Sequence, residues 1–416
     1  MVTSSGSSGT PAANGRRPRR PAVDAVAVEP APPRTASRED GPAGPASIPD
    51  QPARAAAKRP RAPRRTRATV VVTGAAGVIG EVLVSQLLGH DDVGKVVAID
   101  VRRGAADGAT WRVGDVRDPV VARQIAGADA VVHLAVDWSL QTPPAERSAL
   151  NVRGTQTAVT AAAAAGIARV VVVTSAAVYG ALADNPLPLE EDAPLQAPPE
   201  GIVADLLEIE RVAADARRVH PGLTVTVVRP AALVGPGVDT LVTRHFAAPR
   251  LLCIKDVEPA WQFCHVDDLA SALVLAALGR VSGVVTVGCD GYLDQRRVED
   301  VSGMKRVEVP ATLAYATAER LHRVGLTPAP ASELAYVMHP LVVPSTALRA
   351  AGWRPSYDNE ACLRAVLDEV RGDVSLAGRR LGRRDATVAG ASAAGATVAV
   401  LGAAAFVRAA RRARSR

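Results

Sequence analysis

Three glycines at intervals of three residues, between an apolar run and a helical pattern, constrain the fold more than any other feature. The β-branched run 69–72 leads into Gly74, Gly77 and Gly80, and a helical pattern continues to about residue 88. In such a strand–turn–helix unit the first glycine permits a tight turn, the second lets a pyrophosphate approach the backbone, and the third lets helix and strand pack closely. The free N–H groups at the helix N-terminus then face the phosphates. The segment predicts a dinucleotide site made by Gly74, Ala76, Gly77, Val78, Ile79 and Gly80.

An acidic residue ends the next apolar run, 95–100. Asp100 follows Gly80 by twenty residues, where a carboxylate can accept hydrogen bonds from ribose hydroxyls. This placement favours NAD, because Asp100 would repel a 2′-phosphate. Arg102 and Arg103 come directly after it and could hold such a phosphate, so NADP stays open as the alternative. We assign Asp100 and Arg102 to the cofactor site.

Short apolar runs alternate with helical segments along the middle of the chain. Runs at 130–134, 169–174 and 223–228 are separated by helical patterns near 145–166 and 201–219. Near-continuous apolar strands of this kind indicate a parallel sheet that is buried on both faces. We therefore expect a Rossmann-type, doubly wound parallel α/β fold over residues 68–371. A smaller C-terminal substrate lobe should come mainly from residues 230–371, with helices near 266–279, 311–323 and 359–371.

The net charge is unevenly distributed. Residues 1–69 hold 13 lysines and arginines against 5 acidic residues, and residues 370–416 hold 10 arginines against 2 aspartates. The whole chain is +7, so residues 70–369 are net acidic, at −9. An acidic middle argues against nucleic acid as a partner. The first tail, 1–67, is rich in Pro, Ala, Gly, Ser and Arg without apolar periodicity, so we expect it to be disordered.

The second tail, 372–416, contains a run of 22 uncharged residues at 386–407. Its length suits a bilayer span, although Ala and Gly make it only weakly apolar, and arginines on both sides leave its orientation open. We expect a helix that anchors the protein to the membrane, with a helix in water or on anionic lipid as the alternatives. The four cysteines form no CxxC pair, which is typical of a reducing compartment and predicts a cytoplasmic location.

Several further blocks carry a resemblance to a known family. They are GDVRD at 114–118, DAVVHLA at 129–135, NVRGT at 151–155, VTSAAVYG at 173–180 and HVDDLA at 265–270. In this order and spacing, residues 69–371 resemble the extended short-chain dehydrogenases, the NAD-dependent epimerase/dehydratase family. The chain is similar above all to an atypical actinobacterial subgroup of UDP-glucose 4-epimerase-like proteins that lacks the family's YxxxK pair.

The resemblance implies a cofactor, a substrate class and further site residues. The cofactor is NAD, and the substrate is a small molecule such as a nucleotide sugar. Asp115 and Val116 match the segment that contacts the adenine, while Leu134 and Ala135 match the strand end beside the nicotinamide. Family members pair through the helices near 145–166 and 201–219, so the resemblance also implies a homodimer.

The acid–base residues that the family uses are missing. The resemblance implies a tyrosine that exchanges the substrate's hydroxyl proton, a lysine four residues later that lowers the tyrosine's pKa, and a serine at the reacting oxygen. Ser175 matches the serine, but no tyrosine or lysine occurs between residues 180 and 254. The best alignment puts Ile202 and Leu206 at the two positions. A phenol with a pKa near 10 needs such a neighbouring ammonium group to work near pH 7.

Three functions are therefore open. The first is an oxidoreductase-like enzyme whose base comes from elsewhere, with Ser175 and Tyr179 as candidate catalytic residues and His133 and Asp205 as further candidate bases. The second is a catalytically inactive dinucleotide-binding sensor or scaffold. The third is a ligand-binding part of a membrane-linked assembly.

Other polar residues follow in the second half. Arg244, His245 and Arg250 could contact a phosphate, with ordinary surface charge as the alternative reading. The run 265–268 has metal-ligand residue types, but an aspartate at a helix start usually caps the helix, so we expect no metal.

Overall fold

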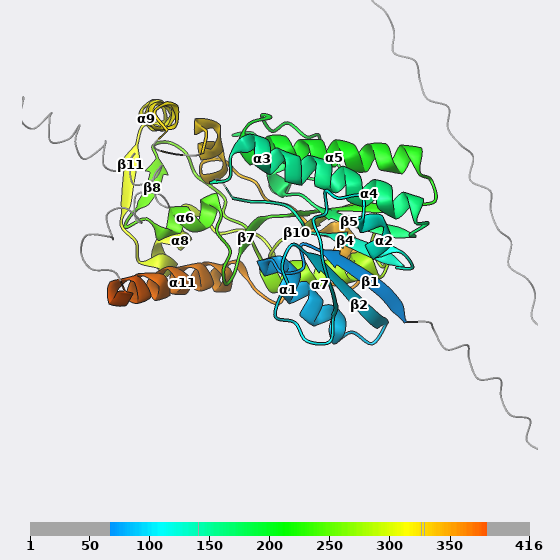
Figure 1. The fold of residues 1–416 in the computed structure, drawn as a ribbon. Helices are drawn as coiled ribbons and strands as arrows, with labels where there is room; N and C mark the ends of the chain where they lie inside the picture. The colour runs from blue at the N-terminus through cyan, green and yellow to red at the C-terminus, as the bar shows by residue number, and fades with distance from the viewer. Residues whose placement is uncertain (1–66, 140, 326, 328, 381–416) are drawn as a thin grey trace, which may run out of the picture. The chain divides into compact units, whose positions relative to one another are not determined.

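The computed structural model describes residues 67–139, 141–325, 327 and 329–380, and a parallel sheet of seven strands runs through its centre (Figure 1). The strands lie in the order β10-β6-β5-β4-β1-β2-β3, and all neighbouring pairs are parallel. The order reverses between β1 and β4, and ligands of such sheets bind beside the carboxyl ends at that point. The bounds are β1 Ala68–Thr73, β2 Val93–Asp100, β3 Thr110–Val113, β4 Ala130–His133, β5 Arg169–Val173, β6 Thr224–Pro230 and β10 Val284–Val287.

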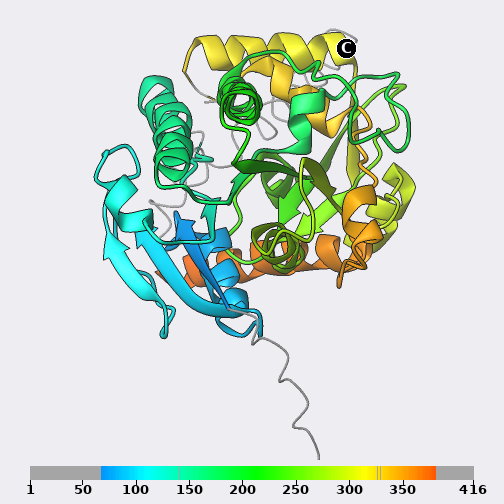
Figure 2. The ribbon, with the colours of Figure 1, turned by 90° about the vertical axis from the view of Figure 1, so that its right-hand side faces the viewer.

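Helices cover both faces of this sheet, as Figures 1 and 2 show. Helices α1 (Val78–Leu88) and α7 (Val266–Ala277) pack against each other on one face. The other face carries α2 (Val121–Ile125), α4 (Gly154–Ala164) and α5 (Gly201–Val219). The predicted doubly wound parallel α/β fold is therefore confirmed.

The first strand shows why its sequence is an unbroken apolar run. Val70 and Val72 point to one face, where they join Leu83 of α1 in an apolar cluster. Val71 points to the other face and joins the cluster that contains Ile209 of α5. Because helices cover each face, the residues that point to either side of the strand are buried and apolar.

The long helical pattern near 145–166 is not one regular helix. It consists of α3 (Pro144–Ser148), a π-helical turn η1 (Ala149–Arg153) and α4. A 3₁₀ turn η2 (Ala176–Tyr179) follows β5, and a short helix α10 (Thr346–Ala350) contacts β10.

A smaller apolar cluster forms the C-terminal lobe. It contains residues from β7 to β9, α6, α8, α9, η3 and α11, while α7 and β10, from the same half of the chain, return to the main sheet. Pairs β8–β11 and β7–β9 are each parallel. The bounds are β7 Ala232–Val234, α6 Leu241–Ala247, β8 Leu251–Ile254, β9 Phe263–His265, α8 Gln295–Ser302, β11 Arg306–Val309, α9 Ala311–Arg323, the 3₁₀ helix η3 Ala331–Val337 and α11 Asn359–Arg380.

The two tails fall largely outside the described residues. Within the part of the chain that the structure describes, no helix is both long enough and apolar enough to span a membrane. The apolar segment 386–407 and residues 1–66 lie outside that part, so the anchoring helix and the disordered N-terminal tail stay predictions.

Candidate functional site

Two of the three glycines are required by the protein's own packing. Gly74 has a φ of +69°, and a Cβ on it would lie 2.5 Å from the backbone nitrogen of Ala135. A Cβ on Gly80 would lie 2.2 Å from the carbonyl oxygen of Gly74. Any side chain at either position therefore forces the backbone to shift, in agreement with the roles predicted for a tight turn and a close helix.

The middle glycine is different. Gly77 precedes the first residue of α1, is exposed and lines a cavity. A Cβ on Gly77 would meet only the carbonyl oxygen of Gly74, at 3.3 Å. The fold itself thus has little need for glycine here, whereas a pyrophosphate approaching the N-terminus of α1 would need it. The loop fits a dinucleotide on this observation.

Asp100 and Arg102 both contact the glycine loop. The Asp100 carboxylate accepts hydrogen bonds from the backbone N–H of Ala76 at 3.0 Å and from the N–H of Arg102 at 3.3 Å. The Arg102 guanidinium in turn donates to the carbonyl oxygen of Ala76. A carboxylate has about four acceptor sites, so Asp100 can hold the loop and still accept from a ribose hydroxyl.

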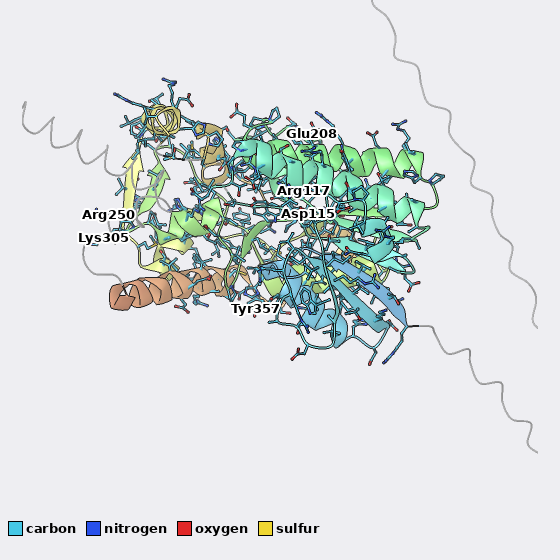
Figure 3. All side chains as sticks on the ribbon, viewed as in Figure 1. Asp115, Arg117, Glu208, Arg250, Lys305 and Tyr357 are labelled. Carbon is cyan, nitrogen blue, oxygen red and sulfur yellow. The ribbon has the colours of Figure 1, made fainter. Side chains whose placement is uncertain are left out.

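The remaining predicted cofactor residues lie at the ends of neighbouring strands. Leu134, just after β4, lines the cavity, and Ala135 lies against Gly74. Val116 is buried after β3, next to Asp115. Arg117 donates from Nε to both carboxylate oxygens of Asp115 at 3.0 Å, and this hydrogen bonding lowers the pKa of Asp115 (Figure 3). Asp115 and Val116 thus follow the carboxyl end of β3, and Leu134 and Ala135 follow that of β4.

A cavity of about 440 Å³ connects the glycine loop to the C-terminal lobe. Its wall runs from Gly74 and Gly77 past Ser175 to Trp261 and Gln262. Most of the lining is apolar, which is the usual character of a small-molecule site with a few orienting polar groups. The polar lining residues are Ser139, Thr174, Ser175, Asp239, Thr240, Gln262, Glu333, Tyr336 and His339.

Ser175 lies where the sequence predicts. It follows β5 and caps η2, and its hydroxyl oxygen accepts a hydrogen bond from the N–H of Ala177 at 3.1 Å. The residue is half-buried and lines the cavity. A serine hydroxyl that accepts one bond can still donate its proton to a ligand oxygen.

Tyr179, the other candidate catalytic residue, lies in the interior beneath the cavity wall. Its side chain is buried, and its hydroxyl donates to the carbonyl oxygen of Glu191 at 2.7 Å. Arg229 donates to the same hydroxyl at 2.9 Å and is itself bound to Glu210 at 2.8 Å. Burial raises the pKa of the Tyr179 phenol. With its oxygen bonded on both sides inside the protein, Tyr179 serves to join η2 to β6.

His133 and Asp205 also have structural partners. The His133 ring lies between the hydroxyls of Thr73 at 2.8 Å and Thr155 at 3.1 Å, and burial lowers its pKa to about 4. The buried Asp205 carboxylate is bound to Nε of Arg147 at 2.9 Å. A neutral core histidine and an ion-paired aspartate fit packing roles better than proton transfer.

Aliphatic side chains from the start of α5 line the cavity. Ile202 and Leu206, the residues aligned with the missing tyrosine and lysine, both line the cavity. Both aligned positions therefore lie on the cavity wall. Among the described residues no lysine lines the cavity, so none of them places an ammonium group there to lower the pKa of a phenol.

Three titratable residues of the cavity wall belong to none of the motifs in the sequence. Glu333, Tyr336 and His339 come from η3 and the residues just after it, and all three line the cavity. Their spacing of three matches the three residues per turn of a 3₁₀ helix, which brings such side chains to one face. That spacing, within the largely apolar stretch 329–343, is the signal that the sequence offers.

The three residues considered for phosphate binding have different surroundings in the structure. Arg244 is bound to Asp239, a residue of the cavity wall, with Nε 2.6 Å from Oδ1. His245 is buried and stacks on Trp261 with ring centroids 5.2 Å apart, and burial lowers its pKa to about 4. Arg250 is exposed.

The helix cap at the start of α7 comes from a different residue than expected. The His265 Nδ1 accepts from the N–H of Asp267 at 3.3 Å. Asp268 is buried and accepts from the N–H groups of Ser356 and Tyr357 at 2.8 and 3.1 Å. Among the described residues, no group of three or more His, Cys, Asp or Glu side chains could hold a metal.

Comparisons with known proteins agree with this geometry. Residues 70–288 match the sequence model of the NAD-dependent epimerase/dehydratase family. An uncharacterized protein of Mycobacterium tuberculosis is 28% identical over 303 residues, covering 69% of this chain and 80% of that protein. The dTDP-glucose 4,6-dehydratase of Streptomyces griseus is 29% identical over 256 residues, covering 55% of this chain and 76% of that enzyme.

Solved structures share the fold. The UDP-glucose 4-epimerase of Thermotoga maritima, solved with UDP-glucose, has a TM-score of 0.56 and 19% identity, covering 74% of this chain and 99% of that chain. The UDP-glucose 4-epimerase of Thermus thermophilus, solved with NAD, has a TM-score of 0.56 and 22% identity, covering 73% and 99%. The matched family is NAD-dependent, which confirms the cofactor that the glycine loop predicts.

Proposed function

The chain belongs to the NAD-dependent epimerase/dehydratase family, and from this premise we propose that it acts on a hydroxyl- or keto-bearing small molecule, with a nucleotide sugar as the substrate class. One observation carries the proposal: a single cavity links Gly77, at the N-terminus of α1, with Ser175 and with Trp261 of the C-terminal lobe. A cofactor and a substrate bound at its two ends would meet beside Ser175. The nucleotide sugars found with related structures support the substrate class.

Each part of the site has a role under this proposal. The N–H groups of α1 and the space above Gly77 would hold the pyrophosphate, and Asp100 would accept from the ribose hydroxyls. When bound, NAD accepts or returns a hydride. Ser175 would donate a hydrogen bond to the reacting oxygen, while the apolar wall at Leu134 and Leu206 would keep water away.

A second function is favoured by one specific observation. Ile202 and Leu206 leave the usual acid–base positions aliphatic, as would suit a dinucleotide-binding sensor or scaffold that has lost catalysis. The two functions share NAD binding and differ in turnover, so one series of measurements separates them.

Binding is tested by titrating the full chain with NAD and following tryptophan fluorescence, since Trp138 and Trp261 line the cavity. Gly77→Val should weaken binding by at least about tenfold, or about 1.4 kcal/mol, by crowding the pyrophosphate. Gly222→Val is the matched control, because a Cβ on Gly222 meets nothing within 4 Å. If the wild type has no affinity for NAD, or if both variants bind as the wild type does, the proposed cofactor site is wrong.

Turnover is tested with NAD and a panel of nucleotide sugars, starting with UDP-glucose, by NADH absorbance and mass spectrometry of the products. The proposal expects turnover that falls in Ser175→Ala while NAD affinity is kept. Micromolar NAD affinity without turnover across the panel would instead support the inactive binding protein.

We also propose a homodimer, a cytoplasmic location and attachment to the membrane through the C-terminal segment. A light-scattering mass of about twice the 43.0 kDa chain would support the dimer through α4 and α5. For the tail, the full chain should fractionate with membranes while a chain ending at residue 372 should not. Equal behaviour of the two chains would reject the anchor.

A further inference from the structure

The C-terminal lobe brings an unpartnered carboxyl group into the cavity wall. Glu333 is only 6% exposed, and its Oε1 has no hydrogen-bond partner among the described residues. An unpaired buried polar atom is costly, and such atoms in native proteins usually have a ligand or a functional reason. Glu333 is also one of the residues that line the cavity, so its side chain belongs to the wall that a bound molecule would meet.

This carboxyl group lies beside the first turn of α5. Gly201 opens that helix with a φ of +57°, and a Cβ on it would lie 2.7 Å from Oε1 of Glu333. The next cavity-lining residues of the helix are Ile202 and Leu206. The carboxyl group therefore borders the place where other members of the family carry their acid–base residues.

Resting on the proposed function, we infer that Glu333 exchanges the proton of the substrate hydroxyl, in place of the tyrosine and lysine that Ile202 and Leu206 have replaced. In the oxidising direction the substrate O–H bond breaks and its proton goes to the Glu333 carboxylate. Bound NAD would supply the acceptor for the hydride that leaves the adjacent C–H bond with its electron pair, and the C–O bond would become a carbonyl. In the reverse direction, protonated Glu333 returns the proton to the oxygen.

Glu333 suits this role better than its two titratable neighbours. Burial raises its pKa to about 7, so both protonation states are populated near neutral pH, as proton exchange requires. The Tyr336 hydroxyl donates to the carbonyl oxygen of Ala177 at 3.1 Å, and burial raises its pKa above the ordinary value of 10. Burial lowers the pKa of His339, which weakens it as a base.

The charges around Glu333 leave it titratable. Arg147 is bound to Asp205 at 2.9 Å, and Arg244 is bound to Asp239 at 2.6 Å. Each guanidinium is thus largely neutralised by another carboxylate, and burial dominates the pKa of Glu333. The groups that face it are Arg147 of α3, Arg244 of α6, His322 of α9 and Tyr336 of η3.

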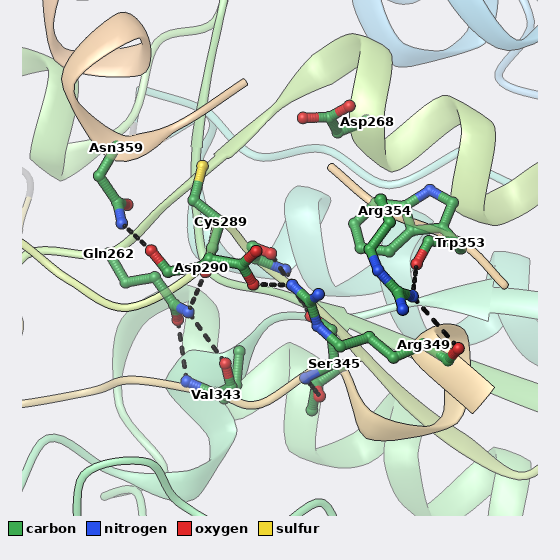
Figure 4. A network of polar contacts seen from close by, with 12 residues as sticks. Gln262, Asp268, Cys289, Asp290, Val343, Ser345, Arg349, Trp353, Arg354 and Asn359 are labelled. Atoms are coloured by element: carbon green, nitrogen blue, oxygen red, sulfur yellow. Dashed lines mark hydrogen bonds and ion pairs between the residues drawn. The ribbon is translucent and has the colours of Figure 1, made fainter. Parts of the chain in front are cut away.

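Contacts on both sides hold the segment that carries Glu333. Before it, the Ser332 hydroxyl donates to the Glu200 carboxylate at 2.6 Å. After it, Gln262 donates to the carbonyl oxygen of Val343 at 2.9 Å and accepts from the Val343 N–H at 2.8 Å (Figure 4). A group that exchanges protons must keep its position within a few tenths of an ångström, and these contacts restrain η3 on the cavity.

The test compares the full-length wild type with Glu333→Gln, which keeps the shape but cannot take up a proton. The control is Glu319→Gln, an exposed acid on α9. NAD and UDP-glucose are the probes. In the wild type, kcat for oxidation should rise with pH through 7 as Glu333 loses its proton. In Glu333→Gln, kcat should be at least about 100-fold lower and should not rise in this range, while the affinity for NAD should be unchanged. Glu333→Asp should recover part of the rate.

A second readout needs no turnover. In the protein without ligands, the difference in unfolding free energy between Glu333→Gln and the wild type should grow as pH rises through 7, and the control should show no such change. Turnover of Glu333→Gln at the wild-type rate and pH profile would overturn the inference and leave the proposed function standing. No turnover by the wild type of any nucleotide sugar in the panel, with NAD still bound, would overturn both.

Discussion

A carboxyl group that is buried without a partner should affect the pH dependence of the unfolding free energy as well as that of catalysis. The perturbation is Glu333→Gln. Burial raises the pKa of Glu333 from 4.5 to about 7 in the folded chain. The folded state therefore favours the protonated form, so the carboxyl group's favourable contribution is complete below pH 4.5 and is lost as pH rises through 7.

The size of this effect follows from the two pKa values. One pKa unit corresponds to 1.36 kcal/mol, so complete ionisation of Glu333 costs the wild type about 3 kcal/mol. Glutamine has no such titration. The unfolding free energy of Glu333→Gln, relative to the wild type, should therefore increase by about 2.5 kcal/mol between pH 5 and pH 8. The variant should be the more stable protein above pH 7, a typical exchange of stability for function.

Urea unfolding at a series of pH values measures this difference directly. All other titrating groups affect both proteins alike and cancel in the comparison. In thermal unfolding, a difference of about 2.5 kcal/mol in a domain of about 300 residues corresponds to about 4 °C in relative Tm. A constant difference between the two proteins from pH 5 to pH 8 would refute the reasoning, because Glu333 would then titrate as an exposed acid does.

Three further predictions test the site and its support. Gly80→Ala should destabilise the fold by about 1–3 kcal/mol in thermal unfolding, because its Cβ would lie 2.2 Å from the carbonyl oxygen of Gly74; an unchanged Tm would contradict the packing. Arg229→Met should cost about 3–5 kcal/mol, since it leaves Glu210 buried without its partner at 2.8 Å, and full stability in urea would speak against that ion pair. Asp100→Ser should weaken NAD by about tenfold while affecting NADP less, as measured by fluorescence titration; equal losses would remove Asp100 as the ribose acceptor.

Most of the sheet could be predicted from sequence because its strands are buried on both faces. The runs 130–134 and 169–174 became β4 and β5, since unbroken apolar residues suit only this environment. Strand β3 (Thr110–Val113) escaped prediction because it lies at the edge of the sheet, where its residues are half-buried or exposed and the apolar signal is weak.

The site residues also differ in whether local sequence or tertiary packing determines their role. Gly74, Gly77, Gly80 and Asp100 were identifiable because a local strand–turn–helix unit imposes its own spacing on the sequence. Tyr179 illustrates the limit of this approach: it stands two residues from the cavity-lining Ala177, yet its ring is buried and its hydroxyl bonds Glu191. Whether a side chain faces the cavity or the core depends on packing that the motif does not describe.

By itself the sequence determined the dinucleotide loop and the loss of the tyrosine–lysine pair, because both depend on residues close together in the chain. Only the tertiary structure brought Glu333 to the start of α5, where it lies against Gly201 although 132 residues separate them. The spacing of 333, 336 and 339 hints at a shared face, but the burial and the missing partner of Glu333 arise from the packing of the C-terminal lobe on the sheet. A proton-carrying group can be supplied in this way by a segment with no motif of its own.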